Sequence, residues 1–336
     1  MHEVITYDQI ARGKDFVDVM TRRAGLDPEK VESGAIFGSG LDGFVEGEMD
    51  RGSVRIPFDE VFEAMGMPKS QGGVPGHAKE LVIGPLKGTS SDEGCSEDRL
   101  VIAQAGREHP YEGVSTQRAT VWLRIMQLKG VQNLIGSNAA GIVTPETLSV
   151  SSLMLIMGDK DYARDFDNPL IGPNDERFGP RNAGMKDKYP FATRALIKVV
   201  AKQLEIGLDE GIYGRVKGPS YEPRELVYEF RALLKAIYGA ACDQAGEVDY
   251  REDPVGVFGM SSTYEAEVAK HASLSKVHPA FKNRAWISAL TNYAGALGPD
   301  GIVEENDHSE VKRNAELVQD CFQRLVRGVL LELRKS

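Results

Sequence analysis

The first candidate for chemistry is a glycine-rich loop near the start of the chain. Residues 38–43 read Gly-Ser-Gly-Leu-Asp-Gly, follow an apolar run and match G-x-G-x-x-G, in which glycines let the backbone approach a pyrophosphate. Dinucleotide binding needs a helix that begins within the motif, whereas the residues that follow, with Gly47 and Gly52, predict a strand. A small phosphate cradle in which Ser39 donates its hydroxyl is therefore favoured over NAD binding or a simple turn.

A second group of candidates carries side chains that bind anions. Arg107 and His109 lie directly after an apolar run, where a guanidinium can hold phosphate oxygens with two nitrogens and an imidazole can add a donor. The alternatives are a surface ion pair for Arg107 and an ordinary hydrogen-bonded role for His109. His77, in GGVPGHAKEL, is open between chemistry and a Gly-Pro loop.

Two segments of small residues follow other apolar runs. The first, Asn138-Ala139-Ala140-Gly141, would let a ligand rest against backbone N–H groups, or would serve tight packing between a strand and a helix. The second, Met260-Ser261-Ser262, offers a hydroxyl for phosphate and a thioether for an apolar sugar or ring face. A lone methionine is, however, more often part of a core.

Two further dipeptides carry the types of side chain that suit a purine. Tyr221 is followed by Glu222, and Thr291-Asn292 ends another apolar run. An aromatic ring can stack on the base, a carboxylate can accept from its N–H groups, and an amide both donates and accepts. The alternatives are a capped helix start at Glu222 and a turn at Asn292.

Strands and helices must position these segments. Short apolar runs that end in small residues predict buried strands at 35–37, 100–103, 134–135, 255–258 and 285–290. Helical spacing of apolar residues predicts helices at 8–24, 115–129, 191–206, 223–237, 264–273 and 309–333, the first capped by Asp8. The alternation favours an α/β architecture with sites at the carboxyl ends of strands.

The chain is expected to form one domain over residues 1–336. Two polar, acidic segments, 89–98 and 243–253, interrupt the alternation and contain few apolar anchors, so they are interpreted as surface insertions. No repeat, long low-complexity tract or proline-rich hinge divides the sequence.

Composition narrows the class of protein and its partners. A net charge of -10 argues against nucleic acid or an anionic membrane as the main partner. The three cysteines, Cys95, Cys242 and Cys321, lack zinc-site spacing and disulfide-scaffold density, so we expect no metal and a cytoplasmic location. No secretory signal and no apolar stretch of about 20 residues is visible.

Taken in order, these loops resemble those of the trimeric, 6-oxopurine-specific purine nucleoside phosphorylases. The resemblance extends from about Gly34 to Val311. Its motifs are Gly38-Ser39-Gly40-Leu41, Val74-Pro75-Gly76-His77-Ala78, Gly106-Arg107 with His109 and Tyr111-Glu112-Gly113, Asn138–Gly141, NPLIGPNDERFGPR at 168–181, Gly218-Pro219-Ser220, Gly259-Met260-Ser261 and Thr291-Asn292. It implies a single α/β domain whose central mixed, twisted and partly barrel-like sheet is flanked by helices.

The resemblance also implies a role for each candidate. Phosphate would be held by Ser39, His77, Arg107, His109, the backbone at Ala139, and Ser261. Ribose would contact Tyr111, Met260 and His308, together with Phe178 of a neighbouring subunit. The base would contact Tyr221, Glu222, Thr291 and Asn292. His109, Glu222 and Asn292 would take part in catalysis.

The implied reaction is phosphorolysis of inosine or guanosine, or their deoxy forms, to a free purine and (deoxy)ribose 1-phosphate. Phosphate would be a co-substrate, no metal or organic cofactor would be needed, and the chain would form a homotrimer. The rival within the family is 5′-methylthioadenosine phosphorylase, which Glu222, Asn292 and His308 oppose. Rivals from other classes are an NAD-dependent oxidoreductase and a purine-binding protein without turnover.

The sequence departs from the family pattern in three respects. Tyr221 stands where phenylalanine is usual, Ile142 stands where a second glycine is common, and the two acidic insertions lengthen the chain. Stacking on the base should survive the first change. The insertion that ends at Asp253 puts the loop geometry near the ribose in doubt.

Overall fold

A computed structural model describes residues 4–38, 40–70, 78–89, 99–242, 253–302 and 308–335. Its strands are β1 (Val31–Phe37), β2 (Val54–Pro57), β3 (Glu80–Gly84), β4 (Leu100–Ala105), β5 (Asn133–Ile142), β6 (Leu153–Asp161), β7 (Asp209–Arg215), β8 (Gly256–Gly259), β9 (Asn283–Tyr293), β10 (Leu297–Gly298) and β11 (Gly301–Ile302).

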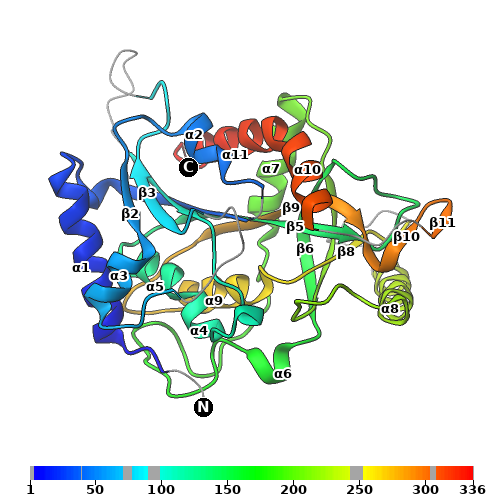
Figure 1. Ribbon diagram of the computed structural model, residues 1–336, viewed down its shortest axis with the longest axis horizontal. Helices are drawn as coiled ribbons and strands as arrows, with labels where there is room; N and C mark the ends of the chain where they lie inside the picture. The colour runs from blue at the N-terminus through cyan, green and yellow to red at the C-terminus, as the bar shows by residue number, and fades with distance from the viewer. Residues whose placement is uncertain are drawn as a thin grey trace.

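The helices alternate with these strands (Figure 1). They are α1 (Tyr7–Arg23), α2 (Gly43–Glu48), α3 (Phe58–Met65), α4 (Thr116–Ala119), α5 (Val121–Leu128), α6 (Arg164–Asp167), α7 (Phe191–Gln203), α8 (Arg224–Cys242), α9 (Thr263–Ser273), α10 (His308–Leu317) and α11 (Gln319–Leu333). Short 3-10 turns lie at Pro28–Lys30, Pro110–Glu112 and Ala294–Ala296.

One mixed sheet of nine strands forms the centre, in the order β2-β3-β4-β1-β5-β8-β7-β6-β9. Strand β9 also pairs with β5, so β5, β8, β7, β6 and β9 close into a ring. The pairs of β1 with β4 and β5, and of β5 with β9, are parallel, whereas β5–β8 and β6–β9 are antiparallel. The predicted α/β class with a mixed, partly barrel-like sheet is therefore confirmed.

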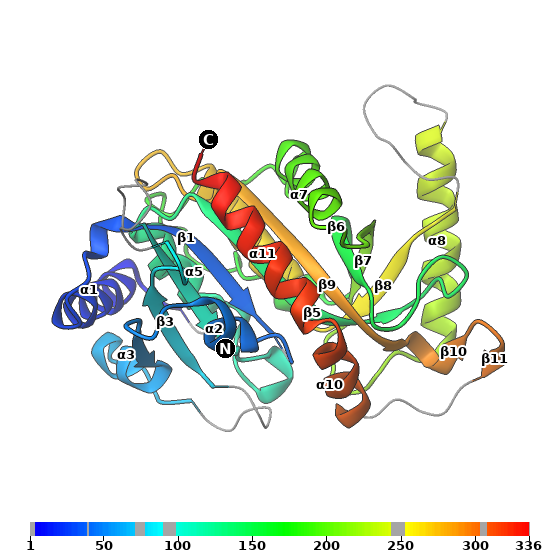
Figure 2. The same cartoon turned by 90° about the horizontal axis from the view of Figure 1, so that it is seen from above.

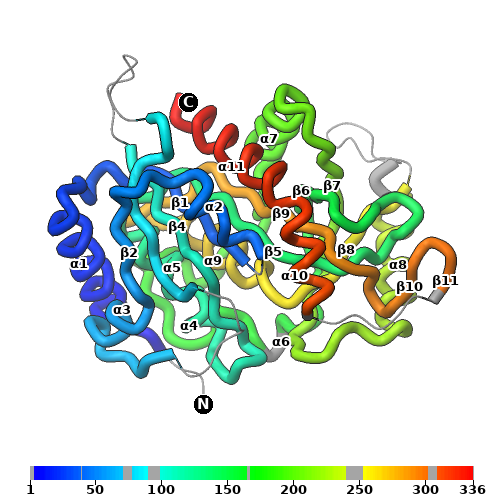
Figure 3. Tube along the Cα trace, turned by 45° about the horizontal axis from the view of Figure 1, so that its top comes forward, coloured from blue at the N-terminus to red at the C-terminus, as the bar shows by residue number. Residues whose placement is uncertain are grey.

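Helices cover both faces of this sheet because its strands carry apolar side chains on both sides. Neighbouring residues of β1 illustrate this: Ile36 packs into the core beneath α1, α3, α5 and α9, while Phe37 packs into the core beneath α2, α7 and α11. Figure 2 shows α11 lying diagonally across the sheet, and Figure 3 shows α10 beside β9. Strands buried on both faces read as continuous apolar runs, which is how the sequence revealed them.

Several predicted boundaries need correction. Helix α1 is capped by Thr6, not Asp8, because the Thr6 side chain accepts from the Gln9 backbone and Gln9 returns the bond. The predicted helix at 115–129 is two helices that meet at Thr120, and the one at 309–333 divides at Val318.

The segment after the glycine-rich loop contains a helix that was not predicted. Helix α2 begins at Gly43 and spans only six residues, and the predicted strand follows it as β2. Ser39 lies outside the described residues, as do 90–98 and 243–252 of the two acidic segments. Among the described helices, none combines the length and apolar character needed to cross a membrane.

Candidate active site

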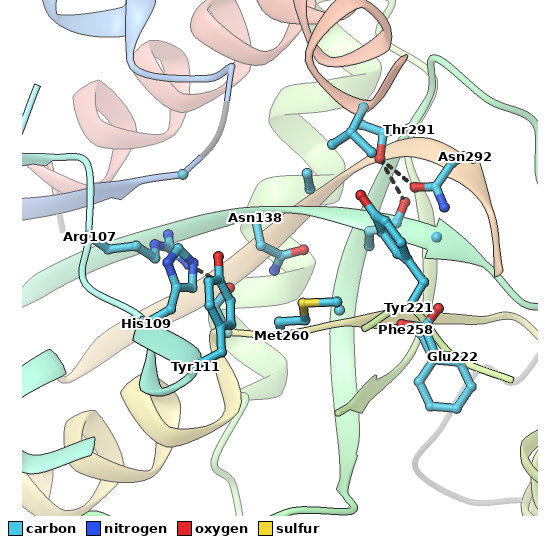
Figure 4. Close-up of a pocket in the computed structure, with 17 residues that line it drawn as sticks. Arg107, His109, Tyr111, Asn138, Tyr221, Glu222, Phe258, Met260, Thr291 and Asn292 are labelled. Atoms are coloured by element: carbon cyan, nitrogen blue, oxygen red, sulfur yellow. Dashed lines mark hydrogen bonds between the residues drawn. The ribbon is translucent and has the colours of Figure 1, made fainter. Parts of the chain in front are cut away.

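A pocket of about 100 Å³ opens where the carboxyl ends of several strands meet (Figure 4). Its wall combines Gly38 after β1, Arg107, His109 and Tyr111 after β4, residues 138–141 of β5, Tyr221 and Glu222 before α8, residues 258–261 at the end of β8, Thr291 and Asn292 of β9, and Val311 of α10. Ten side chains or backbone positions predicted from sequence thus lie around one cavity. They come from five separate segments of the chain.

One end of the pocket is cationic. Arg107 is only 1% exposed, and its Nη1 donates to Ser261 Oγ at 2.7 Å while its Nη2 donates to the carbonyl oxygen of Ser137. Glu265 Oε1 lies 3.5 Å from Arg107 Nη1 and Trp286 Nε1 donates to Glu265 Oε2 at 3.3 Å, so the guanidinium is held from behind. Burial raises the pKa of Glu265, and the neighbouring Arg107 opposes this shift.

His109 and Tyr111 border the cationic end. Their rings stack with centroids 4.7 Å apart, and Glu112 Oε1 accepts from the His109 backbone N–H at 2.9 Å and lies 3.1 Å from His109 Nδ1. Burial lowers the pKa of His109, an effect that Glu112 only partly opposes. The imidazole is therefore neutral near pH 7, with Nδ1–H directed to Glu112.

The middle of the pocket depends on a close approach of two loops. Gly218 has φ of 73°, and a Cβ there would lie 2.5 Å from Met260 Sδ and 2.9 Å from Tyr111 Cδ1. Only glycine lets the segment that leads to Tyr221 pass this close. Met260 and Tyr111 thus form the wall between the cationic end and Tyr221.

The opposite end presents one buried acceptor and one buried donor. Glu222 is 7% exposed, and its Oε2 has no hydrogen-bond partner in the described part of the chain. Burial raises the pKa of Glu222 to about 6. Asn292 Oδ1 accepts from Thr291 Oγ1 at 2.9 Å, whereas Asn292 Nδ2 has no partner among the described residues. Because buried polar atoms are normally paired, these two atoms indicate a polar ligand edge.

Four predicted site residues do not join this pocket in the described structure. Ser39 and His77 lie outside the described residues, and His308 begins α10 but its side chain is not described. Phe178 is described but does not line this pocket: its ring is 8% exposed within its own chain, where it packs 5.3 Å from the Tyr7 ring and beneath Arg124. Its contact with the ribose of a neighbouring subunit stays a prediction.

Sequence reasoning missed two lining side chains and misplaced two segments. Phe258 lies just before the Gly259-Met260 motif, and its aromatic type was the available signal. Val311 lies on α10, where no motif marks it. Residues 138–141 and 291–292 were predicted to follow strands, but they lie within β5 and β9.

Comparisons with known proteins agree with this geometry. A family model described as the phosphorylase superfamily matches residues 67–331. Purine nucleoside phosphorylase 1 of Bacillus subtilis is 33% identical over 91% of this chain and 93% of its own length, and the Mus musculus purine nucleoside phosphorylase is 34% identical over 71% of each. A crystal structure of isoform 2 of purine nucleoside phosphorylase from Schistosoma mansoni, with cytosine and ribose-1-phosphate, has a TM-score of 0.75 at 23% identity and 97% coverage of both chains.

The chain thus belongs to the phosphorylase superfamily. Within it, the chain belongs to the purine nucleoside phosphorylases, which are pentosyltransferases. This membership removes the interpretation of the glycine-rich loop as an NAD site, even though a short helix does follow that loop.

Proposed function

We propose that this chain cleaves inosine and guanosine with inorganic phosphate, releasing the purine and ribose 1-phosphate. The proposal rests on the different chemical character of the two ends of the pocket described above. Arg107 and Ser261 form its anion-binding end. Glu222 Oε2 and Asn292 Nδ2, which lack a partner in the part of the chain that the structure describes, form its opposite end. A 6-oxopurine offers the matching N1–H donor and O6 acceptor.

In this mechanism the C1′–N9 bond breaks, its electron pair moves onto the purine, and a phosphate oxygen bonds to C1′. Phosphate held by Arg107, His109, Ser261 and the backbone at Ala139 would stabilise the positive charge on the ribose and then attack it. Neutral His109 would accept a phosphate O–H. Asn292 and Glu222 would stabilise negative charge on the leaving base, so catalysis is mainly electrostatic and positional.

Ribose and the base ring face would meet the remaining pocket residues. Tyr111 and Met260 lie between the two ends, where the sugar would lie, and Tyr221 would lie against the purine. Ser39, His77 and His308 are proposed to complete the phosphate and 5′-hydroxyl contacts. Methylthioadenosine is a less suitable substrate because its 6-amino group is a hydrogen-bond donor and would face another donor, Asn292 Nδ2.

The direct test is release of base from inosine and guanosine with and without phosphate. We expect release only with phosphate, because the buried Arg107 end holds an anion that water does not replace. Adenosine and methylthioadenosine serve as comparison substrates. Equal rates without phosphate would identify a hydrolase instead, and purine binding without any turnover would identify a binding protein.

We also propose that the chain is a single domain that forms a cytoplasmic homotrimer. One sheet joins strands from Val31 to Tyr293, which supports the single domain. Support for the trimer is the resemblance to trimeric relatives, together with Tyr221, which is 39% exposed and leaves the pocket open to covering by a neighbour.

The trimer predicts a mass of about three times 36.8 kDa by light scattering. Specific activity should fall on dilution below the dissociation range, because an uncovered pocket binds nucleoside less well. A fully active monomer would contradict the trimer proposal and leave the phosphorolysis proposal intact.

A further inference from the structure

Thr291 and Asn292 are adjacent in β9, yet both line the pocket. Successive side chains of a regular strand point to opposite faces, so a regular β9 would present only one of them. The pairing with β5 changes here: Ala140 pairs with Leu290 and Gly141 pairs with Asn292, which leaves Thr291 as an extra residue. Such a bulge redirects side chains, and Figure 4 shows the two groups joined by a hydrogen bond.

The hydroxyl of Thr291 is firmly located. Its side chain is fully buried, and Asn314 of α10 donates to its backbone carbonyl oxygen at 2.7 Å. Thr291 Oγ1 has two acceptors within reach, Asn292 Oδ1 at 2.9 Å and the Ala140 carbonyl oxygen at 3.3 Å. A hydroxyl has one hydrogen, so the shorter contact takes most of the bond.

In the structure this bond holds the Oδ1 end of the Asn292 amide. Nδ2, which has no partner among the described residues, is then the end left for a base. Gly141 of the neighbouring strand β5 gives this amide room, because a Cβ there would lie 3.0 Å from Asn292 Nδ2. A rotated amide would instead present an acceptor, which suits a 6-amino group.

We propose that Thr291 is a positioning residue that fixes the orientation of the Asn292 amide and thereby sets the preference for 6-oxo over 6-amino purines. Thr291 acts through Asn292 rather than by touching the base. The inference rests on the proposed phosphorolysis of inosine and deepens it.

The test replaces Thr291 by valine, which keeps the shape and removes the hydroxyl, and by serine, which keeps the hydroxyl. Thr291→Val should lower the inosine-to-adenosine ratio of kcat/KM by about 3- to 10-fold, the worth of one net hydrogen bond, while the KM for phosphate stays within about twofold. Thr291→Ser should restore the ratio to within about twofold of wild type. Thermal unfolding of each variant checks that the chain is folded, and Thr291→Ala replaces the valine variant if valine prevents folding.

The outcomes separate three possibilities. An unchanged ratio in the folded variant that lacks the hydroxyl overturns the inference, since the amide then keeps its orientation without Thr291. An equal loss of the inosine-to-adenosine ratio in the valine and serine variants, together with a higher KM for phosphate, would assign Thr291 a merely structural role. That outcome would also overturn the inference. Wild-type protein that releases no base from inosine would overturn the proposed function itself.

Discussion

Replacing Arg107 by methionine should raise the KM for phosphate about 100-fold while the KM for nucleoside changes by less than about threefold. The guanidinium is 1% exposed and is fixed by Ser261, the Ser137 carbonyl and Glu265. Each charge-assisted contact to a buried anion is worth about 1.5–3 kcal/mol, and two such contacts account for the loss. Initial rates over a range of phosphate concentrations at saturating inosine measure it.

Two further variants control this experiment. Arg107→Lys keeps the charge but not the paired nitrogens, so its phosphate KM should lie between wild type and Arg107→Met. Arg194→Lys changes a buried arginine that pairs with Glu210 away from the pocket, and it should leave the phosphate KM unchanged. A wild-type phosphate KM in folded Arg107→Met would remove Arg107 from the site.

The sequence was sufficient to predict strands β1, β4, β5, β8 and β9 and most of the pocket wall, whereas β3, β6 and β7 were not predicted. Strand β4, for example, is buried at every position and begins with the apolar run 100–103, which is typical of a strand covered on both faces. Arg107 follows directly from the end of β4. The carboxyl ends of parallel strands meet at one edge of a sheet, so polar residues just beyond these ends lie close together.

What could not be predicted depends on contacts between distant segments. The bulge at Thr291 arises from the pairing of β9 with β5, which no residue spacing in β9 announces. The packing of Phe178 against Tyr7 is a second such contact. The neighbouring Arg177 lies outward, over the Tyr7 ring and paired with Asp175, while the Phe178 ring turns inward beneath Arg124.

Glu222 combines a stability cost with a functional gain in the proposed site. Burial raises its pKa from 4.5 to about 6, so its neutral form is favoured in the folded chain. The contribution of protonated Glu222 to the free energy of unfolding is therefore present at low pH and is lost as the pH rises through about 4.5 to 6. Above that window the free protein carries a buried carboxylate with a cost of about 2 kcal/mol. A ligand N–H directed at Oε2 would offset this cost.

Glu222→Gln should accordingly raise the Tm of the free protein by a few degrees at pH 7.5. It should also lower kcat/KM for inosine about 10- to 100-fold, because the carboxylate that accepts from N1–H is absent.

In wild type, kcat/KM for inosine should fall about tenfold per pH unit below about pH 6, as protonation of Glu222 removes the same acceptor. That acidic limb should disappear in Glu222→Gln if Glu222 causes it, whereas titration of His109 would leave it in place.

Glu267→Gln is the matched control, since Glu267 is a buried glutamate outside this pocket that pairs with Arg164. Differential scanning calorimetry and pH–rate profiles of the three proteins measure these effects. A Glu222→Gln enzyme with full inosine activity and an unchanged acidic limb would show that this carboxylate does not recognise the base.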